Sequence, residues 1–316
     1  MKALLVILNK DNAPALEKCL ASIVNMEGLC TEYDVLIMDG ASSDDSEKIA
    51  RIYEERYPCI EFRVQRRLGG TGYARREACE IAKSGGYDVV VWGDSENVYH
   101  PMYMRNILKK MESSDAVGGV PKVRGGFYAH AFAWYHALHL VIPGLYRYHI
   151  PGNNKAERVE ICSKVQYPET LRSEDYGFSI ILRKNGLNLK QEVAKNAVVE
   201  VSLPESFGEV MAWQRARAKG VAQVLRKIGA KPWDNVGWAS IFLLFVLFAL
   251  LIPFSAIPLL LYSLLYLISA GALFYASKDY ILNFKWLYFI APMFGVLVYS
   301  IYSLFAVFQY IKIKNA

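Results

Sequence analysis

The first part of the chain alternates between short apolar runs and amphipathic segments. Apolar runs of strand length occur at 3–8, 33–38 and 88–92, and residues 60–65 alternate between apolar and polar as a strand does. Between these runs, segments 15–25, 43–57 and 72–83 repeat apolar residues at helical spacing, as Leu16, Leu20 and Ile23 do in the first. This alternation predicts an α/β fold, with a mostly parallel sheet covered by helices on both faces.

The pattern changes completely near residue 236. No charged residue occurs in 236–277 or in 286–311. These runs exceed the roughly 20 apolar residues that a membrane helix needs. They predict three membrane spans at 236–252, 256–276 and 287–311, with Pro253 and Pro258 at the first turn. A single long buried helix is the alternative, and the length of the runs argues against it.

Charge indicates how the two parts are joined. Segment 213–231 contains six lysines and arginines and no acid, which suits a cytoplasmic flank next to anionic lipid headgroups. The N-terminus MKALLVILNK fits a first strand better than a signal peptide. We therefore predict a cytoplasmic α/β domain at 1–203, an amphipathic juxtamembrane segment at 204–235 and a transmembrane domain at 236–316, in a multi-pass protein of the cell membrane.

Composition excludes some functions. The net charge of +6 in 316 residues is explained by the juxtamembrane cluster, and no nucleic-acid-binding signature accompanies it, so no nucleic-acid partner is expected. The five cysteines show no C-x-x-C spacing and predict reduced, unpaired thiols.

Polar residues follow three of the predicted strands. They are Asn9, Asp39 and the triplet Asp94 to Glu96. Ligands of such sheets bind outside the carboxyl ends of the strands. Two acids as close as Asp94 and Glu96 repel each other unless a cation lies between them, and Mg²⁺ or Mn²⁺ bound by such oxygens leaves positions for phosphate. The pattern favours a nucleoside diphosphate ligand. The alternatives are a turn role for Asp39, which precedes a glycine, and a solvated acidic loop for the triplet.

Several separated segments together resemble one family. They are "VILNKDNAPALEKCLASI", "VLIMDGASSDDS", "RLGGTGYARREA", "WGDSEN", "PGNNKAERVE", "LRSEDYGFSIILRKNG" and "WQRARAKG". In this order over about residues 3–220 they resemble the inverting glycosyltransferases of family 2, which have a GT-A fold. "WQRARAKG" is similar to the Gln-x-x-Arg-Trp motif of the membrane-bound branch, which includes ceramide glucosyltransferases, hyaluronan synthases and cellulose synthases.

The resemblance implies roles for individual residues. It implies that Asp39 contacts the nucleotide base, that Asp175 is the general base with Glu174 beside it, and that Gln214 and Arg217 contact the diphosphate. Together with the strand-end argument it gives a candidate site of four groups: donor-binding Asn9, Asp39, Arg67, Gly70, Arg75 and Asp94; metal-binding Asp94 and Glu96; acceptor-side Gly152, Asn153 and Asn154; and catalytic Asp175, Glu174, Gln214 and Arg217.

Each of these roles has a structural alternative. Asp175 opens an apolar helix, where a carboxylate also serves as an N-cap. The arginines suit a solvated basic face, and Gln214 and Arg217 suit an interfacial helix. The chain also departs from the family pattern. Glu96 replaces the usual second Asp of the metal motif, and Ala218 replaces the usual Trp, which puts processive synthesis in doubt.

The leading functional hypothesis is transfer of a sugar from a nucleotide-sugar to a hydroxyl of a lipid or lipid-linked acceptor, with UDP favoured over GDP. A divalent cation is expected as cofactor. The alternatives are transfer to a polyprenyl phosphate, processive polysaccharide synthesis, and a membrane scaffold with a degenerate transferase domain. A nucleotidyltransferase would want a glycine-rich basic loop after the first strand, and "NKDNAP" lacks the glycines.

Overall fold

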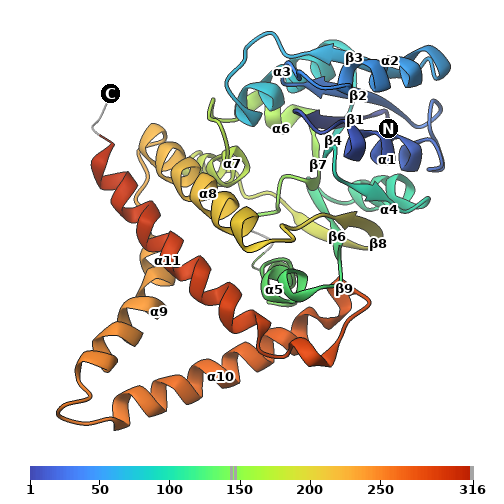
Figure 1. The fold of residues 1–316 in the computed structure, drawn as a ribbon. Helices are drawn as coiled ribbons and strands as arrows, with labels where there is room; N and C mark the ends of the chain where they lie inside the picture. Colours follow the sequence, from blue (N-terminus) through green and yellow to red (C-terminus); the bar gives the residue numbers. More distant parts are fainter. Residues whose placement is uncertain (143–144, 146–147, 314–316) are drawn as a thin grey trace. The chain divides into compact units, whose positions relative to one another are not determined.

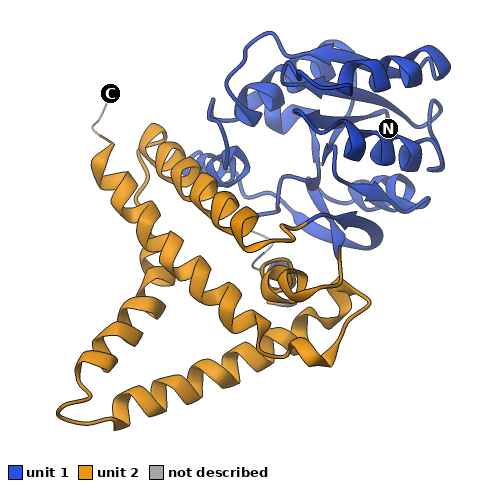
Figure 2. Cartoon of the chain, in the orientation of Figure 1, with its two compact units in different colours: residues 1–122, 143–202 blue, residues 123–142, 203–316 orange. Residues whose placement is uncertain are grey.

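The computed structural model describes residues 1–142, 145 and 148–313. The chain divides into two compact units, each containing two separate stretches of sequence (Figure 2). The first unit comprises Met1–Lys122 and Pro143–Ser202, and the second comprises Val123–Ile142 and Leu203–Ala316. The second unit therefore takes a helix from the middle of the chain as well as the apolar C-terminal helices. The functional division at residues 203 and 235 stays a prediction.

The first unit is built on a mixed sheet with the strand order β3-β2-β1-β4-β7-β6-β8-β5 (Figure 1). The strands β1 to β4 pair in parallel, whereas β7 runs antiparallel to both β4 and β6, and β5 runs antiparallel to β8. The predicted α/β fold is confirmed. The parallel strands β1 to β4 are the strands that the alternating strand and helix pattern predicted. The strands are β1 Ala3–Asn9, β2 Tyr33–Asp39, β3 Ile60–Val64, β4 Val89–Asp94, β5 Val98–Tyr99, β6 Ala116–Arg124, β7 Asn154–Arg158 and β8 Gln191–Val201.

Small residues allow α3 to pack closely on the sheet. Every residue of β1 is buried, and Leu4, Val6 and Leu8 share one face because side chains alternate along a strand. This face joins one hydrophobic core with Ala74 and Ala78 of α3. The helices of the first unit are α1 Ala13–Ile23, α2 Ser46–Arg56, α3 Thr71–Ser84, α4 Tyr103–Met111, α6 Val159–Lys164 and α7 Glu174–Lys184.

The second unit consists mainly of helices that pack around α11. The helix α11 contacts α5, α8, α9 and α10. At Gly295 it meets α5 so closely that an added Cβ would lie 1.7 Å from the backbone oxygen of Ala131. The short strand β9 pairs with the last two residues of β6. The elements are α5 Phe127–Val141, α8 Phe207–Lys227, α9 Trp233–Leu250, α10 Ile257–Ser277, η2 Lys278–Tyr280, β9 Ile281–Leu282, η3 Trp286–Tyr288 and α11 Ala291–Lys312.

Among the described residues, three helical segments are long and apolar enough to cross a membrane: Trp233–Leu250, Ile257–Tyr280 and Trp286–Lys312. They agree with the three spans that the sequence predicts to within a few residues at most ends. Large apolar side chains such as Leu247 and Leu260 are exposed on α9 and α10. Exposed apolar surface of this extent marks a site of contact with lipid or with another apolar surface.

The cysteines differ from the prediction. The structure contains two disulfides, Cys30–Cys59 and Cys79–Cys162, with Cα atoms 5.1 Å and 6.2 Å apart, and only Cys19 is a free, buried thiol. The expectation of unpaired thiols was therefore wrong for four of the five residues. The partners are 29 and 83 residues apart in sequence, so no local spacing reveals them. Strand pairing between β2 and β3 brings the first pair together.

Candidate functional site

Three strand ends meet at one edge of the sheet, as the sequence predicts. In the parallel register Asn9 lies opposite Asp39, and Leu8 lies opposite Asp94. The side-chain amide of Asn9 donates a hydrogen bond to Asp39 Oδ2 at 2.7 Å, with both residues buried. Polar groups from β1, β2 and β4 therefore gather where ligands of parallel sheets bind.

Asp39 shapes the loop that follows β2. Its Oδ1 accepts from the backbone N–H of Ser42, and its Oδ2 accepts from the hydroxyl of Ser42, each at 2.7 Å. Ala41 in the same loop has a φ of 61°, a left-handed conformation that needs such support. The turn role of Asp39 is thus real, and contact with a nucleotide base stays a prediction. Asn9 Oδ1 is buried without a hydrogen-bond partner among the described residues.

Asp94 and Glu96 bring two carboxylates to the end of β4. Burial, and next the carboxylate of Glu96, raise the pKa of Asp94 to about 7. Burial also raises the pKa of Glu96, although Arg172 opposes this. A cation between the two acids would remove the repulsion. Within the described part of the chain no cluster of three or more His, Cys, Asp or Glu side chains suits a metal. A Mg²⁺ or Mn²⁺ ion here would therefore take further ligands from a substrate, as Mg²⁺ commonly does with phosphates.

Arg75 is a deeply buried cation near these acids. Its Nε donates to Glu174 Oε1 at 2.7 Å, and its Nη2 donates to the backbone oxygen of Gly152 at 2.9 Å. The guanidinium lies 4.7 Å from the ring centroid of Trp92. Nη1 is buried and has no hydrogen-bond partner among the described residues. A buried, charged donor without a partner costs free energy unless a ligand binds it. Arg67, by contrast, is exposed and pairs with Glu169.

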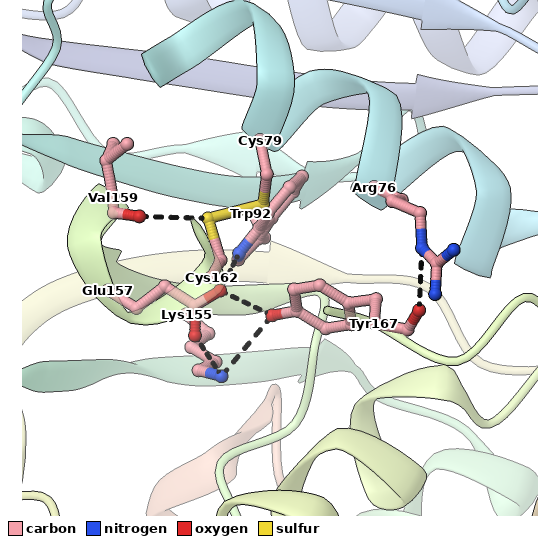
Figure 3. The surroundings of a disulfide bond; sticks show 8 residues. All are labelled: Arg76, Cys79, Trp92, Lys155, Glu157, Val159, Cys162 and Tyr167. Atoms are coloured by element: carbon pink, nitrogen blue, oxygen red, sulfur yellow. Dashed lines mark hydrogen bonds and ion pairs between the residues drawn. A yellow bond between two sulfur atoms is a disulfide. The ribbon is translucent and has the colours of Figure 1, made fainter. Parts of the chain in front are cut away.

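A buried polar network holds Trp92 (Figure 3), whose ring lies against the guanidinium of Arg75. Glu157 Oε1 accepts from the indole N–H of Trp92 at 3.0 Å and from the hydroxyl of Tyr167 at 2.6 Å. Lys155 neutralises Glu157 at 2.5 Å, and both side chains are almost fully buried. The disulfide Cys79–Cys162 joins α3 to α6 beside this network (Figure 3). The sequence analysis did not identify these residues. Lys155 and Glu157 are two positions apart on a strand, a pattern that usually indicates a solvent-exposed face.

Asp175 lies in the first turn of α7 and faces the loop that contains Gly152. The helix begins after Ser173, whose φ of 64° is left-handed, and Ser173 occupies the N-cap position. Asp175 is therefore not the N-cap, and that alternative was wrong. Its Oδ2 accepts from the N–H of Gly152 at 2.9 Å, and its Oδ1 accepts from the N–H of Tyr176 at 2.8 Å. Burial raises the pKa of Asp175, but His149, Arg75 and these N–H groups outweigh it, so that the pKa is lowered.

Two predicted glycines are sites of close backbone approach. A Cβ at Gly70 would lie 2.3 Å from the Cα of Leu171, so the glycine-rich turn packs directly on the loop before α7. A Cβ at Gly152 would lie 2.6 Å from Arg75 Nη2. Their geometry explains why these positions need glycine, whereas direct contact with a donor or acceptor stays a prediction.

The other residues predicted for the acceptor side are bonded to the segment after β4 and to α4. The backbone oxygen of Asn153 accepts from the side-chain amide of Asn97 at 2.7 Å. Asn154 is buried, and its Oδ1 accepts from the hydroxyl of Tyr103 at 2.6 Å. The structure thus brings the segment 152–154 next to Asp175 and Arg75 within the first unit.

Gln214 and Arg217 lie in the second unit, on α8. Gln214 is buried, and its Nε2 has no hydrogen-bond partner among the described residues. The guanidinium of Arg217 lies 4.4 Å from the ring centroid of Tyr135 and 4.7 Å from that of Tyr299, and it donates to the hydroxyl of Tyr299 at 3.1 Å. Within its own unit Arg217 thus joins α8 to α5 and α11. The catalytic roles of Gln214 and Arg217 stay predictions.

One further residue near Asp175 carries no sequence signal. His149 Nε2 lies 3.8 Å from Asp175 Oδ2. His149 immediately precedes the segment "IPGNNKAERVE" and lies outside every helix and strand, so neither spacing nor periodicity marks it.

Comparison with solved structures supports the fold. A mannosyltransferase from Pyrobaculum calidifontis, PcManGT, solved with GDP-Man and Mn²⁺, aligns with a TM-score of 0.60 over 99% of this chain and 87% of its own, at 16% identity. Glucosyl-3-phosphoglycerate synthase from Mycobacterium tuberculosis, solved with Mn²⁺, UDP and glucosyl-3-phosphoglycerate, aligns with a TM-score of 0.52 over 73% and 81%, at 15% identity. Residues 1–349 of S. aureus TarS align with a TM-score of 0.51 over 96% and 90%, at 15% identity. At these identities the likeness concerns the GT-A fold alone.

The sequence comparison goes further than the fold. No curated protein matches the chain. The profile of glycosyl transferase family 2 matches residues 4–167, more than half of the chain. The matched stretch contains the three strand ends, Arg75 and both carboxylates of the candidate cation site. The chain therefore belongs to glycosyltransferase family 2 and is a glycosyltransferase.

Proposed function

We propose that this enzyme transfers a sugar, with inversion, from a nucleoside-diphosphate sugar to a hydroxyl group of a lipid or lipid-linked acceptor. One observation supports this most directly. The guanidinium of Arg75 and the carboxylate of Asp175 both bind Gly152, each at 2.9 Å, and Asp94 and Glu96 lie at the end of β4 in the same unit. An inverting displacement needs these elements: groups that stabilise a leaving diphosphate, and a base for the attacking hydroxyl.

Each residue has a specific task in this proposal. Arg75 directs its unpaired Nη1 to a phosphate oxygen of the donor. Asp175 takes the proton of the acceptor hydroxyl as the hydroxyl oxygen attacks the anomeric carbon. Asp94 and Glu96 would hold a divalent cation, which would supply positive charge for a leaving diphosphate. Gly152 supports both sides of the reaction, because its oxygen accepts from Arg75 while its N–H donates to Asp175.

The donor nucleotide is proposed to be UDP, with GDP as the alternative. The family resemblance favours UDP, with Asp39 and Asn9 near the base and Arg67 and Gly70 at the rim of the donor site. Structural neighbours were solved with either nucleotide: PcManGT with GDP-Man and Mn²⁺, and the M. tuberculosis synthase with UDP and Mn²⁺. Both structures contain Mn²⁺, which supports a divalent cation here.

The proposed acceptor follows from the second unit. Its three apolar helical segments suit a multi-pass cell-membrane protein, and the basic residues of 213–231 suit a cytoplasmic orientation of the catalytic unit. An enzyme fixed in the membrane has ready access to acceptors that reside there. The catalytic roles of Gln214 and Arg217, near the start of this basic segment, are proposed from the membrane-bound branch that the sequence resembles.

Transfer to a polyprenyl phosphate is the second enzymatic candidate. A phosphate acceptor is already anionic and needs no base, so the oriented carboxylate of Asp175 favours a hydroxyl acceptor. Processive polysaccharide synthesis is less well supported, because Ala218 replaces the family's tryptophan and three spans are few for a polysaccharide channel. A scaffold without activity is not favoured for a chain that retains both carboxylates and Arg75.

Calorimetric binding of UDP and of GDP to the detergent-purified chain tests the donor site. We expect binding of one nucleotide in Mn²⁺ or Mg²⁺ and much weaker binding in EDTA. Asp94→Asn should abolish the metal dependence, whereas Glu55→Gln, a change at an exposed position on α2, should leave it intact. Binding of neither nucleotide under any condition would contradict the proposal.

The acceptor is tested by incubating membranes that contain the enzyme with labelled UDP-glucose and GDP-mannose. We expect label in the organic-soluble lipid fraction. A glycoside formed on a hydroxyl survives mild acid, whereas a sugar linked to a lipid phosphate is released. Acid-labile product would therefore favour the polyprenyl-phosphate alternative, and polymer in the aqueous phase would favour processive synthesis.

A further inference from the structure

His149 forms a chain of polar contacts with the first turns of α7. Its Nδ1 lies 3.1 Å from the hydroxyl of Ser179, and its Nε2 lies 3.8 Å from Asp175 Oδ2. The hydroxyl of Ser179 in turn donates to the backbone oxygen of Asp175 at 2.9 Å, the usual bond of a helical serine to the residue four positions before it. The imidazole therefore lies near the carboxylate of Asp175 on its Nε2 side, and Ser179 links its Nδ1 side to the backbone oxygen of the same residue.

These contacts favour one tautomer of the neutral imidazole. The single hydrogen of the Ser179 hydroxyl is used in the bond to Asp175 O, so the serine oxygen can only accept from the imidazole. In the neutral ring Nδ1 is then the donor, and Nε2 carries a lone pair. This lone pair faces Asp175 Oδ2, which is also an acceptor. Two acceptors facing each other are unfavourable until one proton lies between them.

The charges around this pair come from several elements. Arg75 of α3 and Glu174 of α7 flank Asp175 on the donor side, and Asp94 of β4 adds a negative charge. On the other side, Arg183 of α7 donates to the backbone oxygen of Tyr148, the residue before His149. The Tyr176 ring meets the imidazole edge-on, with 6.1 Å between ring centroids. The imidazole itself is partly exposed, at 14% of its side-chain surface.

We propose that His149 is a positioning residue that acts through Asp175, and that its Nε2 receives the proton that Asp175 takes from the acceptor hydroxyl. This inference rests on the proposed function, in which Asp175 is the general base. The acceptor O–H bond breaks while its oxygen bonds to the anomeric carbon. The bond from that carbon to the diphosphate breaks, and its electron pair leaves with the diphosphate. The proton passes to Asp175, then to Nε2, and finally from the partly exposed imidazolium to water.

The contact with His149 helps Asp175 to release the proton that it takes from the acceptor hydroxyl. Arg75 and the N–H groups of Gly152 and Tyr176 stabilise the carboxylate of Asp175, so a proton placed on it returns easily to the acceptor. A neutral imidazole with its lone pair directed at the carboxylate draws the proton away. The distance of 3.8 Å is longer than a hydrogen bond, as is common for catalytic contacts without bound substrate.

The test measures release of UDP from UDP-glucose and of GDP from GDP-mannose, with water as acceptor, by the full chain in detergent at saturating donor and Mn²⁺. Saturation with Mn²⁺ keeps the titration of Asp94 out of kcat. Wild-type kcat should fall as pH is lowered, by up to about tenfold per pH unit, because protonated His149 cannot accept. His149→Gln should lower kcat about 10- to 100-fold near pH 8 and flatten this acid limb, with the donor KM within about twofold.

Two further variants separate proton transfer from folding. Ser179→Ala keeps the imidazole but frees its tautomer, and should lower kcat less than His149→Gln does. His100→Gln, a change at an exposed histidine of the same unit, should leave kcat and its pH profile unchanged.

The inference is wrong if His149→Gln retains wild-type kcat, or if its acid limb stays where it is in the wild type. It is also wrong if the variant loses donor affinity and thermal stability without a change in the pH profile, because that result indicates a structural role. An inactive Asp175→Asn beside a normal His149→Gln would overturn this inference alone. No metal-dependent nucleotide release by the wild type, or an active Asp175→Asn, would overturn the proposed function and this inference together.

Discussion

Arg75 of α3 and Glu174 of α7 form an ion pair of 2.7 Å in which both side chains are almost fully buried. Taking two charges out of water is expensive, so such a pair is weak evidence for stability as such. The position of the ion pair suggests a role in the site instead. Glu174 precedes Asp175, and Nη1 of Arg75 has no hydrogen-bond partner among the described residues, so the ion pair connects the proposed donor side with the proposed base.

Arg75→Lys should weaken nucleotide binding while the fold is retained. Lysine keeps the charge near Glu174 but cannot also reach Gly152 O and a phosphate oxygen, because it lacks the planar fork of arginine. Loss of one hydrogen bond to a charged group predicts a loss of about 1.5 to 3 kcal/mol in binding free energy. Calorimetry with UDP and GDP measures it, with Arg56→Lys on the exposed side of α2 as control. Unchanged affinity would refute the donor role of Arg75.

The stability of the metal-free protein should depend on Asp94. Its pKa of about 7 in the folded chain lies well above the value near 4 expected when unfolded. Between roughly pH 4 and 7 the folded state therefore binds more protons, and stability falls as pH rises through this window.

A divalent cation competes with that proton at Asp94. Mn²⁺ should raise the unfolding temperature more at about pH 8 than at about pH 5.5, because metal ligands bind in their deprotonated form. Asp94→Asn should abolish most of the response to Mn²⁺, which thermal unfolding at both pH values measures. An equal response at both pH values, or in the variant, would count against a cation at this carboxylate.

Asp175→Asn should remove sugar transfer and leave donor binding nearly intact. The amide keeps an oxygen to accept from Gly152 N–H, but it cannot take a proton from a hydroxyl. General-base catalysis contributes about 10²- to 10⁴-fold, so a loss of this size in kcat is expected. Nucleotide release from the donor sugar and calorimetry on the same preparation separate the two effects. Loss of donor affinity instead would show that Asp175 supports the donor site.

Gly72→Ala should destabilise the first unit. A Cβ at Gly72 would lie 2.1 Å from the backbone oxygen of Pro168, and backbone cannot rotate away as a side chain can. Forced overpacking costs about 1 to 3 kcal/mol in unfolding free energy. Gly208→Ala in α8 meets nothing within 4 Å and serves as the control. Urea unfolding followed by tryptophan fluorescence compares the variants, and equal midpoints would show that the loop before α7 can move away from α3.

Part of the site could be predicted because it depends on local pattern and on the rules of parallel sheets. Asn9, Asp39 and Asp94 each end an apolar strand, and parallel strands end at the same edge, so their meeting follows from the strands alone. The N-cap interpretation of Asp175 was wrong because a helix boundary shifted by two residues changes which side chain caps, and such boundaries are weakly marked in sequence.

The sequence by itself determined the α/β alternation, the apolar C-terminal segments and the acids at the strand ends. Burial of a strand or helix makes apolar residues recur at a short spacing, and that spacing is visible in the local sequence. Only the tertiary structure decided that Arg75 pairs with Glu174 across 99 positions, that Cys79 meets Cys162, and that His149 faces Asp175. These contacts depend on the paths of loops and on how closely α3, α6 and α7 pack. A contact between distant segments exists only in the folded chain, so no periodic pattern in the sequence predicts it.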